Sequence, residues 1–199
     1  MDIELSPTAA QIVGTACNLL VSGGYNSFSY ADIARHVQIT KASIHHHFPS
    51  KANLVQTVVQ LHREKSRNGL MALTAKFDDP LVELRAYTEH WSACILDRSP
   101  SFCICAMLAP EIPSIPSEVA QEVHGFFEDL TAWLAYVLER GAAKRQFELE
   151  RTPSEEAKSF VAIVYGAMLG ARAYADPGAF GAIVSPAIDR LKRKTSRAK

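Results

Sequence analysis

Long apolar runs without charge are missing from this chain of 199 residues. The longest one, residues 159–171, has thirteen residues, whereas a helix that spans a membrane needs about 20. The N-terminus begins Met1-Asp2-Ile3-Glu4, which is acidic where a signal peptide is basic. Ten glycines and ten prolines are too few for a collagen-like or wholly disordered chain. We therefore expect a globular, cytoplasmic protein without a membrane partner.

Cysteine is scarce, and its spacing does not match a common zinc motif. The four cysteines are Cys17, Cys94, Cys103 and Cys105, and none belongs to a Cys-x-x-Cys pair. The cytosol keeps thiols reduced, and a chain of this length does not need disulfides to stabilise its core. The cysteines are therefore interpreted first as small buried apolar side chains. The sequence predicts no metal site and no cofactor.

Neither sign of charge dominates, since the chain has 21 basic and 21 acidic residues. The last ten residues nevertheless carry six basic side chains and no acidic one, so the remainder of the chain has a charge of −6. Basic side chains near a helix C-terminus are favoured by the helix dipole, and chain ends are commonly frayed. We interpret the basic tail as a solvated helix end.

Apolar residues recur at helical spacing along nearly the whole chain, and no segment shows sustained period-two alternation. Helix starts are marked by capping residues, such as Ser6 before Pro7 and Thr152 three residues before Glu155. The sequence therefore predicts an all-α fold with about nine helices.

Residues 29–48 have the pattern of two short helices joined by a tight turn. Ile33, Ile44 and Phe48 are placed to form a small core that fixes the two helices at a steep angle, with polar side chains outside. This is the arrangement of a helix-turn-helix, whose second helix enters the major groove of DNA. The predicted DNA-binding residues are Ser29, Thr40, Lys41, Ala42, Ser43, His45, His46, His47 and Lys51.

These residue types suit contact with a nucleic acid. Hydroxyl groups and lysines donate to phosphate oxygens, and histidines donate to purine acceptors. Lys51, in the first turn of the next helix, can join that helix N-terminus in binding a phosphate. The three successive histidines are not expected to hold a metal ion, because neighbouring side chains of a helix point about 100° apart.

Residues 8–62 resemble the DNA-binding domain of TetR/AcrR-type transcriptional regulators. The resemblance rests on Ile33-Ala34, Ile39, Lys41, Ser43-Ile44 and Phe48-Pro49-Ser50-Lys51. Two positions depart from the family pattern. Gln38 stands where the turn usually has Gly, so it must adopt a left-handed conformation or shift the turn. His45 stands where the family usually has Tyr.

The resemblance implies a division of the chain by function. Residues 1–50 would form the helix-turn-helix domain, residues 50–76 a connecting helix, and residues 77–199 a ligand-binding and dimerisation domain. It also implies a homodimer whose two recognition helices read palindromic half-sites of double-stranded DNA about 34 Å apart. The remaining implied partner is an unidentified small-molecule effector.

Aromatic and small side chains of the C-terminal part mark candidate ligand and dimer surfaces. The candidate lining of an apolar ligand pocket is Tyr87, His90, Trp91, Phe102, Met107, Phe126, Phe127 and Trp133. The candidate dimer interface is Gly166, Ala167, Gly170, Ala171 and Tyr174. Small residues let helices approach closely, as in a four-helix bundle formed by two chains. Packing inside one chain is the alternative for both sets.

The segment Phe102-Cys103-Ile104-Cys105, with Glu111 beyond it, resembles the Gly-Cys-Leu motif of an electrophile- and oxidant-sensing subset of the same family. Cys103 matches the reactive thiol of that motif, and Phe102 replaces its glycine. On one helix, Cys103 and Cys105 would lie about 200° apart and could not form a disulfide. No base near them can be identified from the sequence. Cys103 is thus either a buried structural thiol or a thiol sensor.

Catalytic motifs are also missing. The chain has no Ser-His-Asp spacing, no nucleotide-binding loop and no HExxH motif, and Glu83 and Glu89 are interpreted as facing solvent. We therefore expect a DNA-binding transcriptional regulator and not an enzyme. The expected form is a homodimeric repressor that a small molecule or thiol modification releases from its operator. The alternative is an all-α ligand carrier or enzyme that binds no operator.

Overall fold

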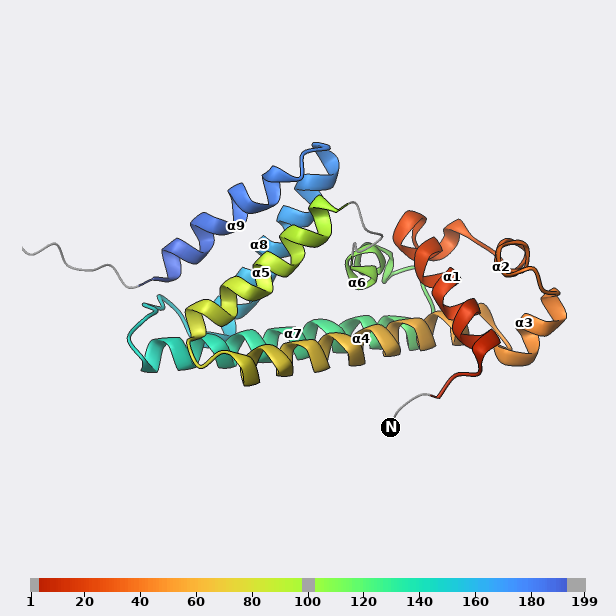
Figure 1. Ribbon diagram of the computed structural model, residues 1–199, viewed down its shortest axis with the longest axis horizontal. Coiled ribbons are helices and arrows are strands. Elements are labelled where there is room, and N and C mark those ends of the chain that lie inside the picture. Colours follow the sequence, from red (N-terminus) through yellow and green to blue (C-terminus); the bar gives the residue numbers. More distant parts are fainter. Residues whose placement is uncertain (1–3, 98–102, 193–199) are drawn as a thin grey trace, which may run out of the picture. The chain divides into compact units, whose positions relative to one another are not determined.

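The computed structural model describes residues 4–97 and 103–192. Within these residues the chain forms nine α-helices and two short 3-10 helices (Figure 1), and the one β-type pairing is a bridge between Phe147 and Lys192. The predicted all-α fold with about nine helices is confirmed. None of the helices in these two ranges is both long and apolar enough to cross a membrane.

The elements fall into two compact units, each with its own internal contacts. The first comprises Met1–Ser66 and Pro100–Phe127, and the second comprises Arg67–Ser99 and Glu128–Lys199. Residues 103–127 thus belong to the same unit as α1. The predicted division into residues 1–50 and 77–199 is a division by function, and it stays a prediction.

The first unit is built around α1. Its elements are α1 (Pro7–Gly23), η1 (Tyr25–Ser27), α2 (Tyr30–Val37), α3 (Lys41–His47), α6 (Ile104–Leu108), η2 (Ala109–Glu111), the first part of α4 (Lys51–Lys76) and the start of α7 (Ser117–Ala143). The Ser6 side chain begins α1 by accepting a hydrogen bond from the Ala9 N–H at 3.3 Å. Ile12, Ala16 and Leu20 are completely buried, because a spacing of four places them on one helix face. α1 packs against α2, α3 and α6.

Glu111 connects the end of η2 to the end of α1. Its Oε2 accepts a hydrogen bond from the Tyr25 N–H at 2.7 Å. The same carboxylate lies against Gly24, which has a φ of 80° and where an added Cβ would come within 2.5 Å of Oε1. Only glycine suits both the backbone conformation and the close approach. The segment after α6 is therefore fixed to the loop that precedes α2.

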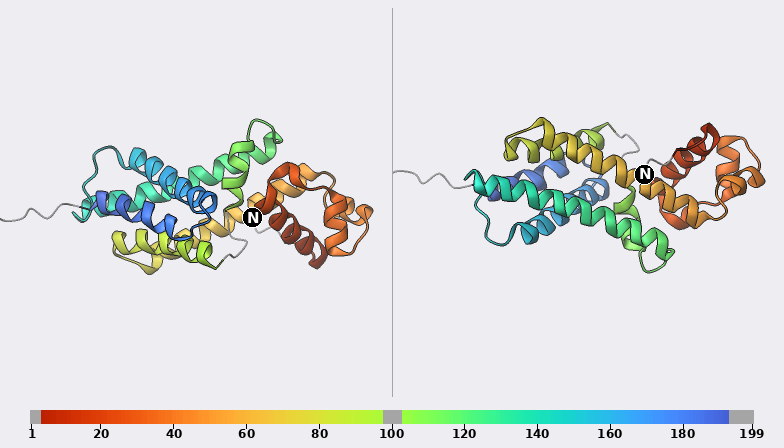
Figure 2. Two further views of the ribbon diagram at one scale, coloured as in Figure 1. Left: turned by 90° about the horizontal axis from the view of Figure 1, so that it is seen from above. Right: turned by 90° about the horizontal axis from the view of Figure 1, so that it is seen from below.

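The second unit contains two helices that lie side by side, α8 (Pro153–Ala173) and α9 (Gly178–Leu191) (Figure 2). It also contains α5 (Pro80–Leu96), the rest of α4 and most of α7. Thr152 and Glu155 form the predicted capping box at the start of α8. Phe160, Val164 and Phe180 are buried where α8 and α9 pack together.

A buried polar network corrects the interpretation of Glu83. This side chain is completely buried on α5 and forms an ion pair with Arg140 of α7 at 2.8 Å. It also accepts a hydrogen bond from Thr74 of α4, whose hydroxyl oxygen in turn accepts one from the Trp133 indole at 3.0 Å. Glu83 therefore joins α4, α5 and α7, whereas Glu89 is exposed as expected.

Candidate nucleic-acid interface

A small apolar core holds α2 and α3 together. Ile33 of α2 and Ile44 of α3 are completely buried, and Phe48, directly after α3, is nearly so. The Tyr30 hydroxyl donates to the Phe48 carbonyl oxygen at 2.8 Å, and burial raises the pKa of Tyr30 to about 12, so the hydroxyl remains a neutral donor. The predicted helix-turn-helix core is present, and it fixes the direction of α3.

The turn between the two helices keeps its usual form despite the absence of glycine. Gln38 has φ 59° and ψ 43°, so the left-handed conformation expected at this position is confirmed. The backbone N–H groups of Gln38 and Ile39 both donate to the Ala34 carbonyl oxygen. The left-handed region costs a residue with a Cβ about 1–2 kcal/mol, and these two hydrogen bonds help to offset that cost.

Two of the predicted DNA-binding hydroxyl groups cap helices. The Ser29 Oγ accepts from the Ala31 N–H at 3.2 Å, while Asp32 accepts from the Ser29 N–H at 2.8 Å. The hydrogen bonds from Ser29 hold the pKa of Asp32 below its usual value. Thr40 Oγ1 accepts from the Ser43 N–H at 3.1 Å and so begins α3. These hydroxyl groups thus shape the ends of both helices.

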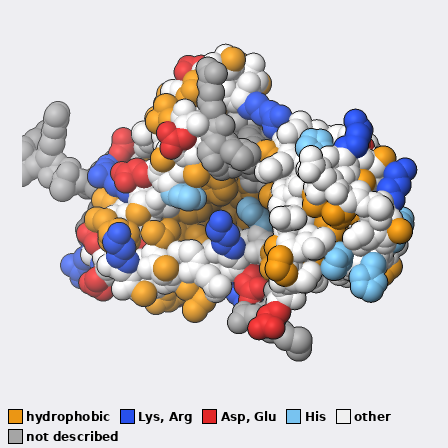
Figure 3. All heavy atoms as spheres, turned by 45° about the vertical axis from the view of Figure 1, so that its right-hand side comes forward, with side chains coloured by type: hydrophobic (Ala, Val, Ile, Leu, Met, Phe, Trp, Pro, Cys, Tyr) orange, Lys and Arg blue, Asp and Glu red, His pale blue; other side chains and the backbone are white. Residues whose placement is uncertain are grey.

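The outer side of α3 forms a polar surface, which we call the α3 surface: Lys41, Ala42, His45 and His46 are exposed, and Ser43 and His47 are half-buried. Figure 3 shows histidine and basic side chains on the first unit, at the right of the view. A short helix that presents cationic and hydrogen-bonding side chains on a rigid core can contact both phosphates and base edges.

His45 is the residue of this surface whose orientation is best defined. Its ring lies edge-on to Tyr30, with centroids 4.8 Å apart, and its Nδ1 lies 3.3 Å from the Pro49 carbonyl oxygen. A neutral ring that donates its Nδ1–H to this carbonyl presents Nε2 as an acceptor, and a protonated ring presents a donor there. His45 thus places an exposed side chain with a polar ring at the usual tyrosine position.

Lys51 does not have the free ammonium group that the sequence suggests. Its Nζ donates to the Phe28 carbonyl oxygen and lies over the rings of Tyr25 and Phe28, at 4.7 and 4.2 Å from their centroids. Burial lowers its pKa. In this structure Lys51 therefore fastens the start of α4 to the segment before α2, and its predicted contact with phosphate stays a prediction.

The predicted ligand-pocket residues are divided between the two units. In the second unit Tyr87 is buried against Trp133, with ring centroids 5.2 Å apart, and His90 is exposed beside Trp91. The members in the first unit are Met107, Phe126 and Phe127. Phe102 lies outside the described residues. A ligand role for this set stays a prediction.

The predicted dimer face of α8 needs a correction. Ala167 and Ala171 are buried inside the second unit, with 0% and 4% of their surface exposed, so they cannot contribute side chains to an interface. Gly166 is exposed, Gly170 is half-buried and Tyr174 is exposed. The spacing of small residues indicated close helix packing, but two of those residues pack within one chain.

The two neighbouring thiols are arranged differently from the prediction. Cys103 is the N-cap of α6 and only Cys105 lies within that helix, so their sulfur atoms are within 4.8 Å of each other. Cys103 Sγ also lies 3.4 Å from Nε2 of His62 on α4. Burial raises the pKa of the Cys103 thiol, but hydrogen bonds with Cys105 and His62 outweigh it and hold the pKa well below its usual value.

The sequence analysis missed His62, which is the base near Cys103. His62 follows the buried residues Val55, Val58 and Val59 by seven, four and three positions, so it lies on the same face of α4. A histidine at a position of the helix that is otherwise apolar was the signal by which the sequence could have identified His62. Its partner, 41 residues further along the chain, could not be found from spacing.

Two known families match the chain. Residues 12–58 match the family described as bacterial regulatory proteins, tetR family. Residues 80–185 match the family described as tetracyclin repressor-like, C-terminal domain. A solved transcriptional regulator of the TetR family from Agrobacterium tumefaciens has a TM-score of 0.91 and 47% sequence identity, over 94% of this chain and 98% of that one.

Two curated proteins are more distant. The nucleoid occlusion factor SlmA of Marinobacter nauticus is 23% identical over 152 residues, which are 76% of each protein. The uncharacterized HTH-type transcriptional regulator YuxN of Bacillus subtilis is 31% identical over 74 residues, 37% of this chain but 25% of YuxN.

The resemblance to the electrophile-sensing subset is not confirmed by these similarities. Reduced NemR of E. coli has a TM-score of 0.83 but only 17% sequence identity, so it shares the fold alone. The match of residues 12–58, in contrast, covers α3 and the helix-turn-helix core. The chain therefore belongs to the TetR family of DNA-binding transcriptional regulators.

Proposed function

We propose that this regulator is a homodimeric, cytoplasmic repressor that binds a palindromic operator through the α3 surfaces of two subunits. The observation that carries the proposal is the α3 surface itself. Thr40 caps the helix, Ile44 anchors it, and Lys41, His45 and His46 remain exposed. Two such helices in a dimer would enter major grooves one helical turn apart, about 34 Å.

An exposed apolar face on α8 and α9 supports the dimer. Leu169 and Tyr174 of this face are 62% and 74% exposed, and Ile183 of α9 is 40% exposed. A Cβ added at Gly166 would meet no atom within 4 Å, so the backbone of α8 is open to a close approach there. Large apolar side chains grouped beside an open glycine suit a two-fold interface in which α8 and α9 of each subunit form a four-helix bundle.

Two features support release by a ligand or by thiol modification. The Trp91 indole Nε1 is buried and has no hydrogen-bond partner among the described residues, so it can donate to a bound small molecule. The Cys103 sulfur lies beside the His62 imidazole, which can accept its proton when an electrophile attacks. Either event would stabilise a conformation that binds DNA weakly. A stabilisation of about 2.8 kcal/mol relative to the DNA-binding conformation lowers operator affinity about 100-fold.

A mobility-shift experiment with the reduced, full-length chain tests the proposed function. We expect retardation of genomic fragments that contain an inverted repeat, and no retardation of scrambled fragments of equal length. Benzoquinone should release the wild-type complex but not the complex of the Cys103→Ser variant. Cys94→Ser is the control, since Cys94 is a half-buried thiol that also lies near a histidine nitrogen, 3.8 Å from that of His90.

The outcomes separate the alternatives. A chain that retards no fragment better than the scrambled ones would indicate an all-α carrier without operator binding. If Cys103→Ser is released by benzoquinone as readily as the wild type, release through Cys103 is wrong.

Replacing Leu169 by Glu should convert the dimer into monomers, because each interface would then bury two unpaired carboxylates. Sedimentation equilibrium should give one chain per particle for Leu169→Glu and two for the wild type. Operator affinity should fall at least about 100-fold, because a monomer reads one half-site. Met71→Glu is the matched control, since Met71 is an equally exposed apolar residue on α4. A dimeric Leu169→Glu variant would place the interface elsewhere.

A further inference from the structure

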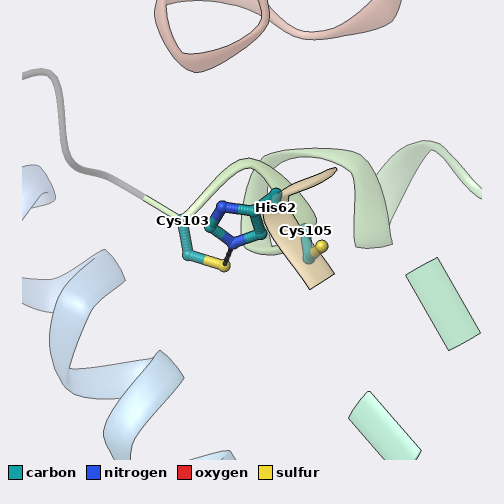
Figure 4. Close-up of side chains that lie close together, drawn as sticks. All are labelled: His62, Cys103 and Cys105. Atoms are coloured by element: carbon teal, nitrogen blue, oxygen red, sulfur yellow. Dashed lines mark hydrogen bonds between the residues drawn. The ribbon is translucent and has the colours of Figure 1, made fainter. Parts of the chain in front are cut away.

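A buried cluster in the first unit has a chemistry that DNA binding does not use. The possible ligand atoms of His62, Cys103 and Cys105 all lie within 4.8 Å of one another, and no other group of three or more such side chains occurs in residues 4–97 and 103–192. Figure 4 shows the imidazole from α4 beside the two thiols from the start of α6. Both cysteines are buried, at 1% and 0% exposure, and His62 is half-buried.

The separations suit a single ion. In a tetrahedral zinc site with Zn–S of about 2.3 Å and Zn–N of about 2.05 Å, sulfur and nitrogen ligands lie about 3.6 Å apart and two sulfur ligands about 3.8 Å apart. The distance from Cys103 Sγ to His62 Nε2 is 3.4 Å, and the other separations do not exceed 4.8 Å. Side-chain adjustments of about 1 Å or less bring all three atoms to bonding positions.

The charges of the cluster favour a divalent, thiophilic ion. Two thiolates and a neutral imidazole carry a charge of −2, so a divalent cation makes the buried site neutral and removes the cost of burying net charge. Two charged side chains that act on Cys105, Arg63 and Glu122, form an ion pair with each other at 3.3 Å. Sulfur and imidazole ligands select zinc over magnesium or calcium, which prefer oxygen.

We propose that His62, Cys103 and Cys105 form a binding site for a divalent, thiophilic metal ion of the zinc type. Three protein ligands leave a fourth position for water or a small ligand. The Cys-x-Cys spacing did not indicate this site, because the third ligand comes from α4. The cation would link α4 to the start of α6, a helix that packs against α1.

A link of this kind would give the ion control over the first unit. The segment from Cys103 to Glu111 contacts α1 at one end and the Tyr25 backbone at the other. An ion that fixes this segment to His62 would therefore change the freedom of the helix-turn-helix to rearrange. This regulatory consequence rests on the proposed function, whereas the metal site itself does not.

The test uses the full-length chain, reduced with a phosphine, freed of metal with a chelator and kept under argon. We expect one Zn²⁺ per chain in competition with a chromophoric chelator. Co²⁺ should give thiolate-to-metal charge-transfer bands and the strong visible bands of tetrahedral coordination. Loss of a residue that only supports a metal ligand lowers metal affinity about 10–100-fold. We expect a larger loss of Zn²⁺ affinity in each of the three ligand variants, His62→Ala, Cys103→Ser and Cys105→Ser. Zn²⁺ should raise the thermal midpoint of the wild type but not of these three variants.

Matched variants keep the experiment decisive. Cys17→Ser and Cys94→Ser remove the other two thiols and should bind Zn²⁺ as the wild type does. The far-ultraviolet circular dichroism of each metal-free variant reports whether it is folded, and any one folded ligand variant suffices. Binding that survives in folded Cys103→Ser, absence of the charge-transfer bands, or no binding by the wild type would overturn the metal site.

Operator binding measured with and without Zn²⁺ separates this inference from the proposed function. A chain that binds Zn²⁺ through the three residues but never binds an operator would disprove only the proposed function. Operator binding without a zinc site would disprove only the metal inference. A change of operator affinity on addition of Zn²⁺, absent in the ligand variants, would support both.

Discussion

Reversing the charge of Lys41 should lower operator affinity at least about 100-fold and leave the fold unchanged. Lys41 is exposed in the first turn of α3 and is not part of the buried core. A lysine that contacts phosphate contributes to binding at all sequences, and a glutamate in its place is repelled by the backbone. If each subunit loses about 1.4 kcal/mol of binding free energy, the dimer loses about 2.8 kcal/mol, which corresponds to an affinity about 100-fold lower.

The comparison needs a charge reversal outside the helix-turn-helix. Lys158→Glu on α8 changes the net charge by the same amount at another exposed position, and it should bind the operator nearly as the wild type does. Affinities measured across a range of salt concentrations should also give a shallower slope for Lys41→Glu, by about one per subunit. If the two variants bind equally well, α3 is not the reading helix.

Replacing Glu83 by Ala should destabilise the protein by about 3–5 kcal/mol. The substitution leaves Arg140, which is 18% exposed, without its carboxylate partner at 2.8 Å, and it also removes one of the two acceptors of the Thr74 hydroxyl. A charge left unpaired in the interior loses its hydration without compensation. Urea denaturation followed by circular dichroism should show a lower midpoint for the second unit, or complete unfolding without denaturant.

Two further variants identify the cause. Glu89→Ala removes an exposed carboxylate from the same helix and should change stability by less than about 0.5 kcal/mol. Replacing both partners, by Glu83→Leu and Arg140→Met, should restore most of the stability because no unpaired charge remains. A Glu83→Ala variant as stable as Glu89→Ala would show that the buried network contributes little.

Local features of this fold were predictable because their partners lie within a few residues. The capping boxes at Ser29 and Thr152 each join a side chain to a backbone group three residues away. The left-handed conformation of Gln38 follows from the length of one turn. Ile33 and Ile44 were found as core residues because helical periodicity identifies the apolar face of a short helix.

The sequence did not show which neighbour a helix face meets. Rings from another part of the first unit approach Lys51, and no feature of the sequence near Lys51 indicated them. Ala167 was expected at a dimer interface, but it is buried inside the second unit. Glu83 lies at a position that suits solvent equally well, and only the approach of Arg140 makes it a buried partner.

The helices, their caps, the tight turn and the polar character of α3 follow from local sequence, since backbone hydrogen bonding and capping act between residues at most a few positions apart. Tertiary structure alone decided that His62 lies beside Cys103, that Glu83 pairs with Arg140, and which side of α8 remains exposed. Such pairings depend on the packing of helices far apart in the chain, and the spacing of residues along one helix carries no information about the helix that will cover it.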